Sequence, residues 1–98
     1  MAGIPVRHFL TLTDFSRQEI SGLLRQAARC KRDRTIGQQV LSRKTIALVF
    51  QKPSTRTRVA FEVAIRQLGG AAIYLGPDDI QLGTREPIRD VARVLSRY

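Results

Sequence analysis

The chain has 98 residues, 43% of them apolar, and this length accommodates at most one small domain. The single cysteine, Cys30, excludes an intramolecular disulfide framework and favours a reducing compartment, so we expect a cytoplasmic protein. No apolar run reaches the length needed to span a membrane, and we expect no membrane partner.

Basic residues outnumber acidic ones by 17 to 8, and the excess lies in the first two thirds of the chain. This balance is compatible with a basic nucleic-acid-binding module, which stays open as an alternative. Aromatic residues make up only 6% of the chain and do not alternate with the arginines, so no base-stacking platform is indicated. We therefore expect no nucleic-acid partner.

The first predicted helix runs from Arg17 to Arg32. Ser16 and Glu19 have the spacing of a capping box, in which each side chain bonds the backbone N–H of the other residue. Behind the box, apolar residues recur at helical spacing and form one stripe, namely Ile20, Leu23, Leu24, Ala27 and Ala28.

A strand, a helix and a second strand follow in chain order. The short, continuous apolar run Thr45–Phe50 predicts a strand that is covered on both faces. The next helix is predicted to begin at Ser54 and to end at Gly69 and Gly70, which suit a left-handed cap. Ala71–Leu75 predicts the second strand, and the short turn before it implies a right-handed parallel crossover.

The last third of the chain is predicted to hold a loop over Gly76–Glu86 and a helix with Pro87 in its first position. The stripe of this helix is Ile88, Val91, Ala92 and Leu95. The predicted fold class is therefore α/β, a parallel sheet with flanking helices. Because two parallel strands bury little surface, we expect an incomplete, doubly wound domain whose remaining strands lie outside this chain.

The junction between the first strand and its helix carries the sequence Ser54-Thr55-Arg56-Thr57-Arg58. The start of a helix presents unpaired backbone N–H groups and the positive end of the helix dipole, and together these bind anions. Hydroxyls at Ser54, Thr55 and Thr57 and the guanidinium of Arg56 would add donors for a phosphate. The alternative is that Ser54 only caps the helix and that the arginines are solvated. No glycine-rich nucleotide-binding motif occurs, so a small, compact anion is favoured.

Phe50–Arg58, Phe61-Glu62 and Leu68–Gly70 resemble the aspartate/ornithine carbamoyltransferase family, in particular its amino-terminal carbamoyl-phosphate-binding domain. The resemblance is stronger to the ornithine-specific members, because Asp79–Gly83, Glu86–Ile88 and Asp90–Tyr98 match them better. It covers nearly all 98 residues.

By this resemblance, residues 1–98 are part of a carbamoyl-phosphate-binding domain, and the ornithine-binding domain is absent. The implied reaction belongs to arginine metabolism and moves the carbamoyl group of carbamoyl phosphate to the side-chain amine of L-ornithine, giving L-citrulline and phosphate. Ser54, Thr55, Arg56 and Thr57 would bind carbamoyl phosphate, as would Gln81 from a neighbouring subunit, and Arg56 would be the catalytic residue.

The resemblance also implies a trimer-based homo-oligomer, no cofactor and no metal. Gln51 and the pair Thr84-Arg85 depart from the usual family residues. The later motifs of the carbamoyl-phosphate site and the motifs that bind ornithine do not occur in these 98 residues, so we expect the chain alone to be inactive. A carbamoyltransferase for putrescine or another amine stays open as an alternative.

Overall fold

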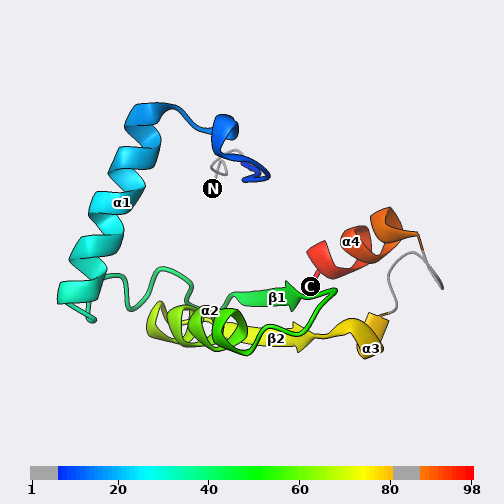
Figure 1. The fold of residues 1–98 in the computed structure, drawn as a ribbon. Coiled ribbons are helices and arrows are strands. Elements are labelled where there is room, and N and C mark those ends of the chain that lie inside the picture. The colour runs from blue at the N-terminus through cyan, green and yellow to red at the C-terminus, as the bar shows by residue number, and fades with distance from the viewer. Residues whose placement is uncertain (1–6, 81–86) are drawn as a thin grey trace. The chain divides into compact units, whose positions relative to one another are not determined.

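The computed structural model describes residues 7–80 and 87–98, and these fall into two compact units that divide between Arg34 and Thr35. The first unit holds the short 3-10 helix η1 (Leu12–Asp14) and the helix α1 (Arg17–Arg32). The second holds β1 (Thr45–Val49), α2 (Thr55–Gln67), β2 (Ala71–Leu75), α3 (Pro77–Ile80) and α4 (Ile88–Ser96), as labelled in Figure 1. In the described part of the chain, no helix is both long and apolar enough to cross a lipid bilayer.

The helix α1 confirms the predicted bounds and the predicted capping box. The Ser16 hydroxyl accepts a hydrogen bond from the Glu19 N–H at 3.1 Å, and the Glu19 carboxylate accepts one from the Ser16 N–H at 2.9 Å. The turn η1 was not predicted. It forms because the Asp14 carboxylate accepts from the N–H groups of Leu10 and Thr11 at 2.6 and 3.0 Å.

The two strands of the second unit pair in parallel, as predicted, with α2 as the crossover between them (Figure 1). Their register joins Thr45 to Ala71 and Val49 to Leu75, so the carboxyl ends of both strands lie at one edge of the sheet. The loops that leave this edge therefore start side by side.

The predicted glycine cap ends α2. Gly69 has a φ of 90°, in the left-handed region, and its N–H donates to the Arg66 carbonyl at 3.0 Å. The N–H of Gly70 donates to the Ile65 carbonyl at 2.9 Å, which completes the paired hydrogen bonds of a Schellman motif. The chain can then turn directly into β2.

The prediction that the first strand is covered on both faces is wrong for the structure described. The face that carries Leu48 and Tyr74 packs against α2, where Leu48 and Ile65 are buried. On the opposite face, Val49 and Ile73 are 39% and 51% exposed. The reason is that α2 covers only one face, whereas a buried parallel strand needs a layer on each side.

The predicted loop over Gly76–Glu86 is wrong in part, because α3 forms a single helical turn at its start. Pro77 and the acidic pair Asp78 and Asp79 suit a first turn, and the Asp79 carboxylate accepts from the Gly76 N–H at 2.7 Å. The last helix is present, although Pro87 is its N-cap residue rather than its first helical residue. Val91 is its buried stripe residue, while Ile88 is exposed.

Candidate functional site

Ser54 occupies the N-cap position of α2, but its hydroxyl makes no hydrogen bond to the helix. The backbone at Ser54 has φ −154° and ψ 89°, whereas the capping residue Ser16 has φ −71° and ψ 163°. The predicted alternative, a Ser54 that serves only as a helix cap, therefore does not describe this side chain. Its hydroxyl is available to a ligand.

The first intrahelical hydrogen bond of α2 joins the Arg58 N–H to the Ser54 carbonyl at 2.9 Å. The N–H groups of Thr55, Arg56 and Thr57 precede it, and none of them has a hydrogen-bond partner among residues 7–80 and 87–98. All three residues are exposed, and the first turn of α2 contains no acidic side chain. The positive end of the helix dipole is thus open and uncompensated.

The two arginines of the junction differ in their surroundings. The Arg58 Nε donates to the Glu62 Oε1, one helical turn further on, at 2.8 Å, and this contact raises the pKa of the Arg58 guanidinium above its usual value. Arg56 forms no ion pair with any residue in the described ranges. Arg56 is therefore the arginine of this turn that is free to meet an incoming anion.

The junction lies at the carboxyl edge of the sheet, where open α/β sheets bind their ligands. Phe50 follows β1, and its N–H donates to the Leu75 carbonyl at 2.9 Å. The Phe50 and Tyr74 rings lie 5.5 Å apart in an edge-to-face arrangement. The structure thus brings Ser54, Thr55, Arg56 and Thr57 together in one turn, while Gln81 lies outside the described residues.

Tyr74 also belongs to this edge, which the sequence did not predict. Its ring lies under the Arg58 guanidinium, with 3.6 Å between the guanidinium carbon and the ring centroid. The available signal was an aromatic residue near the end of a strand, two positions before a glycine that starts a loop. The contact itself is non-local, because it joins the first turn of α2 to the far end of β2, the strand that follows.

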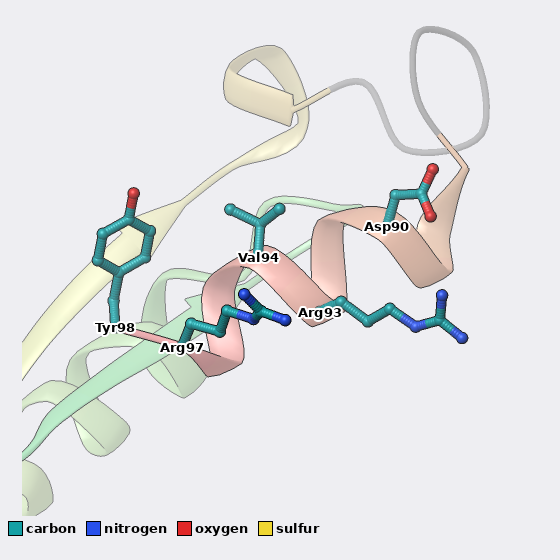
Figure 2. Close-up of a pocket in the computed structure, with 5 residues that line it drawn as sticks. All are labelled: Asp90, Arg93, Val94, Arg97 and Tyr98. Carbon is teal, nitrogen blue, oxygen red and sulfur yellow. The ribbon is translucent and has the colours of Figure 1, made fainter.

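A separate hollow of about 320 Å³ lies along α4 and is lined by Asp90, Arg93, Val94, Arg97 and Tyr98. Figure 2 shows these five side chains on α4 and on the two residues that follow it. None of the predicted site residues lines this hollow, and a single helix surface forms it. The chemistry of the N-terminal turn of α2 makes that turn the better candidate site.

Histidine, cysteine and acidic side chains do not gather into a group of three or more that could hold a metal ion in the part of the chain that the structure describes. The ligand groups at the junction are hydroxyls, backbone N–H groups and a guanidinium, all of which can donate to an anion.

The sequence profile of the family described as aspartate/ornithine carbamoyltransferase, carbamoyl-P binding domain, matches residues 7–98. The chain belongs to this family. An ornithine carbamoyltransferase from Archaeoglobus fulgidus is 48% identical over 95 residues, which is 95% of this chain and 31% of the relative.

Solved structures agree with this assignment. The ornithine carbamoyltransferase from Pyrococcus furiosus is 51% identical, with a TM-score of 0.85 over 94% of this chain and 30% of that one. A structure of N-acetyl-L-ornithine transcarbamylase is 44% identical, with a TM-score of 0.78 over 95% and 30% of the two chains. The chain thus spans about a third of the length of these relatives and has the fold of the carbamoyltransferase carbamoyl-phosphate-binding domain.

Proposed function

We propose that this chain is the front part of an ornithine carbamoyltransferase and that the N-terminal turn of α2 binds the phosphate of carbamoyl phosphate. The observation that carries the proposal is the free Ser54 hydroxyl beside the unpaired N–H groups of Thr55, Arg56 and Thr57. A helix end contributes about 0.3–1 kcal/mol to anion binding, and a charge-assisted hydrogen bond contributes about 1.5–3 kcal/mol. Such contributions suit a small, doubly charged ligand.

In the proposed reaction, the lone pair of the ornithine side-chain amine attacks the carbonyl carbon of carbamoyl phosphate. The new C–N bond forms, the bond from that carbon to the bridging oxygen breaks, and phosphate leaves with the electron pair. The nitrogen loses a proton, which gives citrulline. Arg56 stabilises the charge that develops on the carbonyl oxygen and on the leaving phosphate, because its guanidinium has no carboxylate partner in the described structure.

Several parts of the proposal rest on the family resemblance. These are the contact of Gln81 with carbamoyl phosphate across a subunit boundary, a trimer-based assembly, a cytoplasmic location and the absence of a cofactor. The ornithine-binding domain would lie outside these 98 residues, so the chain alone would bind part of the substrate set without turnover. Activity is therefore to be measured on the longer enzyme that carries this segment.

A second candidate for the acceptor amine is N-acetyl-L-ornithine, which is supported by the similarity to N-acetyl-L-ornithine transcarbamylase, at 44% identity. The ornithine carbamoyltransferases from Archaeoglobus fulgidus and Pyrococcus furiosus are similar to this chain to nearly the same degree, at 48% and 51% identity. Rates measured for the longer enzyme with L-ornithine, N-acetyl-L-ornithine and putrescine would decide between them. We expect the highest rate with ornithine. A higher rate with either of the other amines would identify that amine as the acceptor instead.

The phosphate site is tested by Arg56→Ala in the longer enzyme, with Arg66→Ala as the matched control. Arg66 is exposed in the last turn of the same helix, far from the N-terminal turn. We expect Arg56→Ala to weaken carbamoyl-phosphate binding by roughly 10- to 100-fold and to lower kcat, because a charge-assisted hydrogen bond is lost. Arg66→Ala should change neither. Unchanged affinity and turnover in Arg56→Ala would contradict the assignment.

A further inference from the structure

Arg58 joins the N-terminal turn of α2 to the sheet edge through two contacts of different kinds. Its Nε donates to the Glu62 carboxylate at 2.8 Å, and its guanidinium carbon lies 3.6 Å from the centroid of the Tyr74 ring. The first contact stays within α2, whereas the second reaches across to β2. A guanidinium that is both paired and stacked has fewer donors left for a ligand.

The position of Arg58 in the chain couples these contacts to the candidate site. Its backbone N–H makes the first hydrogen bond of the helix, to the Ser54 carbonyl, so Arg58 closes the turn that presents the free N–H groups. Its side chain fixes the same turn to Tyr74. Arg58 thus contacts both the backbone of this turn and the Tyr74 ring of the sheet.

Tyr74 is itself held in place by its neighbours. The Phe50 ring meets it edge to face at 5.5 Å, and a Cβ atom on Gly76 would lie only 3.0 Å from the Tyr74 Cε2 and Oη. Phe50 and Gly76 are the residues that follow β1 and β2, respectively. The ring is therefore a fixed platform at the point where both loops leave the sheet.

We propose that Arg58 is a positioning residue for carbamoyl phosphate, which acts through its stack on Tyr74 to hold the Ser54–Thr57 turn in its binding orientation. The proposal rests on the proposed function of that turn. Because Glu62 neutralises Arg58, the charge offered to the ligand comes from Arg56, and Arg58 supplies geometry. The ring and the guanidinium are expected to act as one unit.

The test measures the Kd of carbamoyl phosphate and the KM of ornithine in the longer enzyme for Arg58→Met, Tyr74→Leu and the double variant. We expect each single variant to raise the Kd by roughly 3- to 30-fold, the range that corresponds to a cation–π contact. The double variant should bind no more weakly than the weaker single variant, because both changes remove the same contact. The KM of ornithine should stay within about 2-fold of the wild-type value, since the stack acts on the carbamoyl-phosphate turn and no phosphate donor is removed.

Two further variants separate positioning from stability. Tyr74→Phe keeps the ring face and should restore wild-type binding, while Ile65→Val destabilises the same helix and should lower Tm without changing the Kd. If Arg58→Met does not fold, Arg58→Lys replaces it, since Lys keeps the charge but lacks the flat fork that stacks on the ring.

An unchanged Kd in Arg58→Met and Tyr74→Leu would overturn the positioning role, provided that Arg56→Ala weakens binding. A large effect of Arg58→Met with no effect of Tyr74→Leu would also overturn it, because Arg58 would then contact the phosphate directly. If Arg56→Ala leaves the Kd unchanged as well, the proposed function of the turn fails, which is a different result.

Discussion

The backbone of Gly69 passes so close to Gln38 that a Cβ atom on Gly69 would lie 2.3 Å from the Gln38 carbonyl oxygen. Gly69 also has a φ of 90°, a backbone angle that residues other than glycine rarely adopt. We expect Gly69→Ala to lower the free energy of unfolding by at least about 1–3 kcal/mol, measured by urea denaturation.

The control for this prediction is Gly22→Ala in the middle of α1. A Cβ atom there would meet only the end of the Arg25 side chain, at 3.9 Å. Because alanine favours a helix more than glycine does, this variant should gain about 0.5–1 kcal/mol. A loss of equal size in both variants would contradict the role assigned to the Gly69 backbone.

Two serines stand at helix starts, and we expect opposite results from Ser16→Ala and Ser54→Ala. Ser16 bonds the Glu19 N–H, so its loss should cost about 1 kcal/mol of the free energy of unfolding. Ser54 makes no such bond, so its loss should leave that free energy nearly unchanged but should weaken carbamoyl-phosphate binding. Thermal unfolding and ligand titration of both variants check this pair. A stability loss in Ser54→Ala as large as in Ser16→Ala would show that Ser54 is a cap.

The Glu19 carboxylate predicts a pH dependence of stability. A hydrogen bond from Arg7, with a further one from the Ser16 N–H, lowers the pKa of Glu19 to about 2 from its usual value of 4.5. A lowered folded-state pKa stabilises the fold above the unfolded-state pKa, and this contribution disappears as pH falls through the folded-state value. The stability difference between wild type and Glu19→Gln should thus be constant above pH 4.5 and shrink between 4.5 and 2.

Acid titration of both proteins, followed by circular dichroism, measures this difference. Arg17→Ala is a suitable control, because Arg17 lies in the first turn of the same helix and takes no part in the Arg7–Glu19 contact. A difference that stays constant down to pH 2 would rule out Glu19 as its source.

Gly76→Ala is expected to disturb the stack of Arg58 on Tyr74. The added Cβ atom would lie 3.0 Å from the Tyr74 ring, so the ring must shift. The Arg58 Nε proton resonance reports the ring current of Tyr74, and we expect it to move toward its position in Tyr74→Leu. Carbamoyl-phosphate binding should weaken in parallel. An unmoved resonance would mean that the ring accommodates the methyl group without losing the stack.

The elements that the sequence predicted well have local causes. The bounds of α1 follow from Ser16 and Glu19, and the end of α2 follows from Gly69, since these signals lie within a few residues of the boundary that they set. The Arg58–Glu62 ion pair has a local cause of the same kind, because the two residues lie one helical turn apart. The start of α2 next to Ser54 was also predicted, from the change of an apolar strand into a helical run.

The features that the sequence did not predict depend on non-local packing. The stack of Arg58 on Tyr74 needs the crossover to be complete before its partners meet. The exposure of Val49 and Ile73 depends on which layers surround the sheet, and an apolar run alone does not tell one covered face from two. The conformation of Ser54, which decides whether its hydroxyl caps the helix, also escapes a residue-type pattern.

In the parallel register, every pair of facing residues has the same separation along the chain. From Thr45 with Ala71 to Val49 with Leu75, the offset is 26 positions. No pair of this sheet can form by a local hairpin, so the loop that contains α2 must close before any pair gains its hydrogen bonds. In the folding reaction, α2 is therefore expected to form before the sheet. If the stack of Arg58 on Tyr74 orients the Ser54–Thr57 turn as proposed, that turn acquires its orientation only when Tyr74 pairs into the sheet, late in folding.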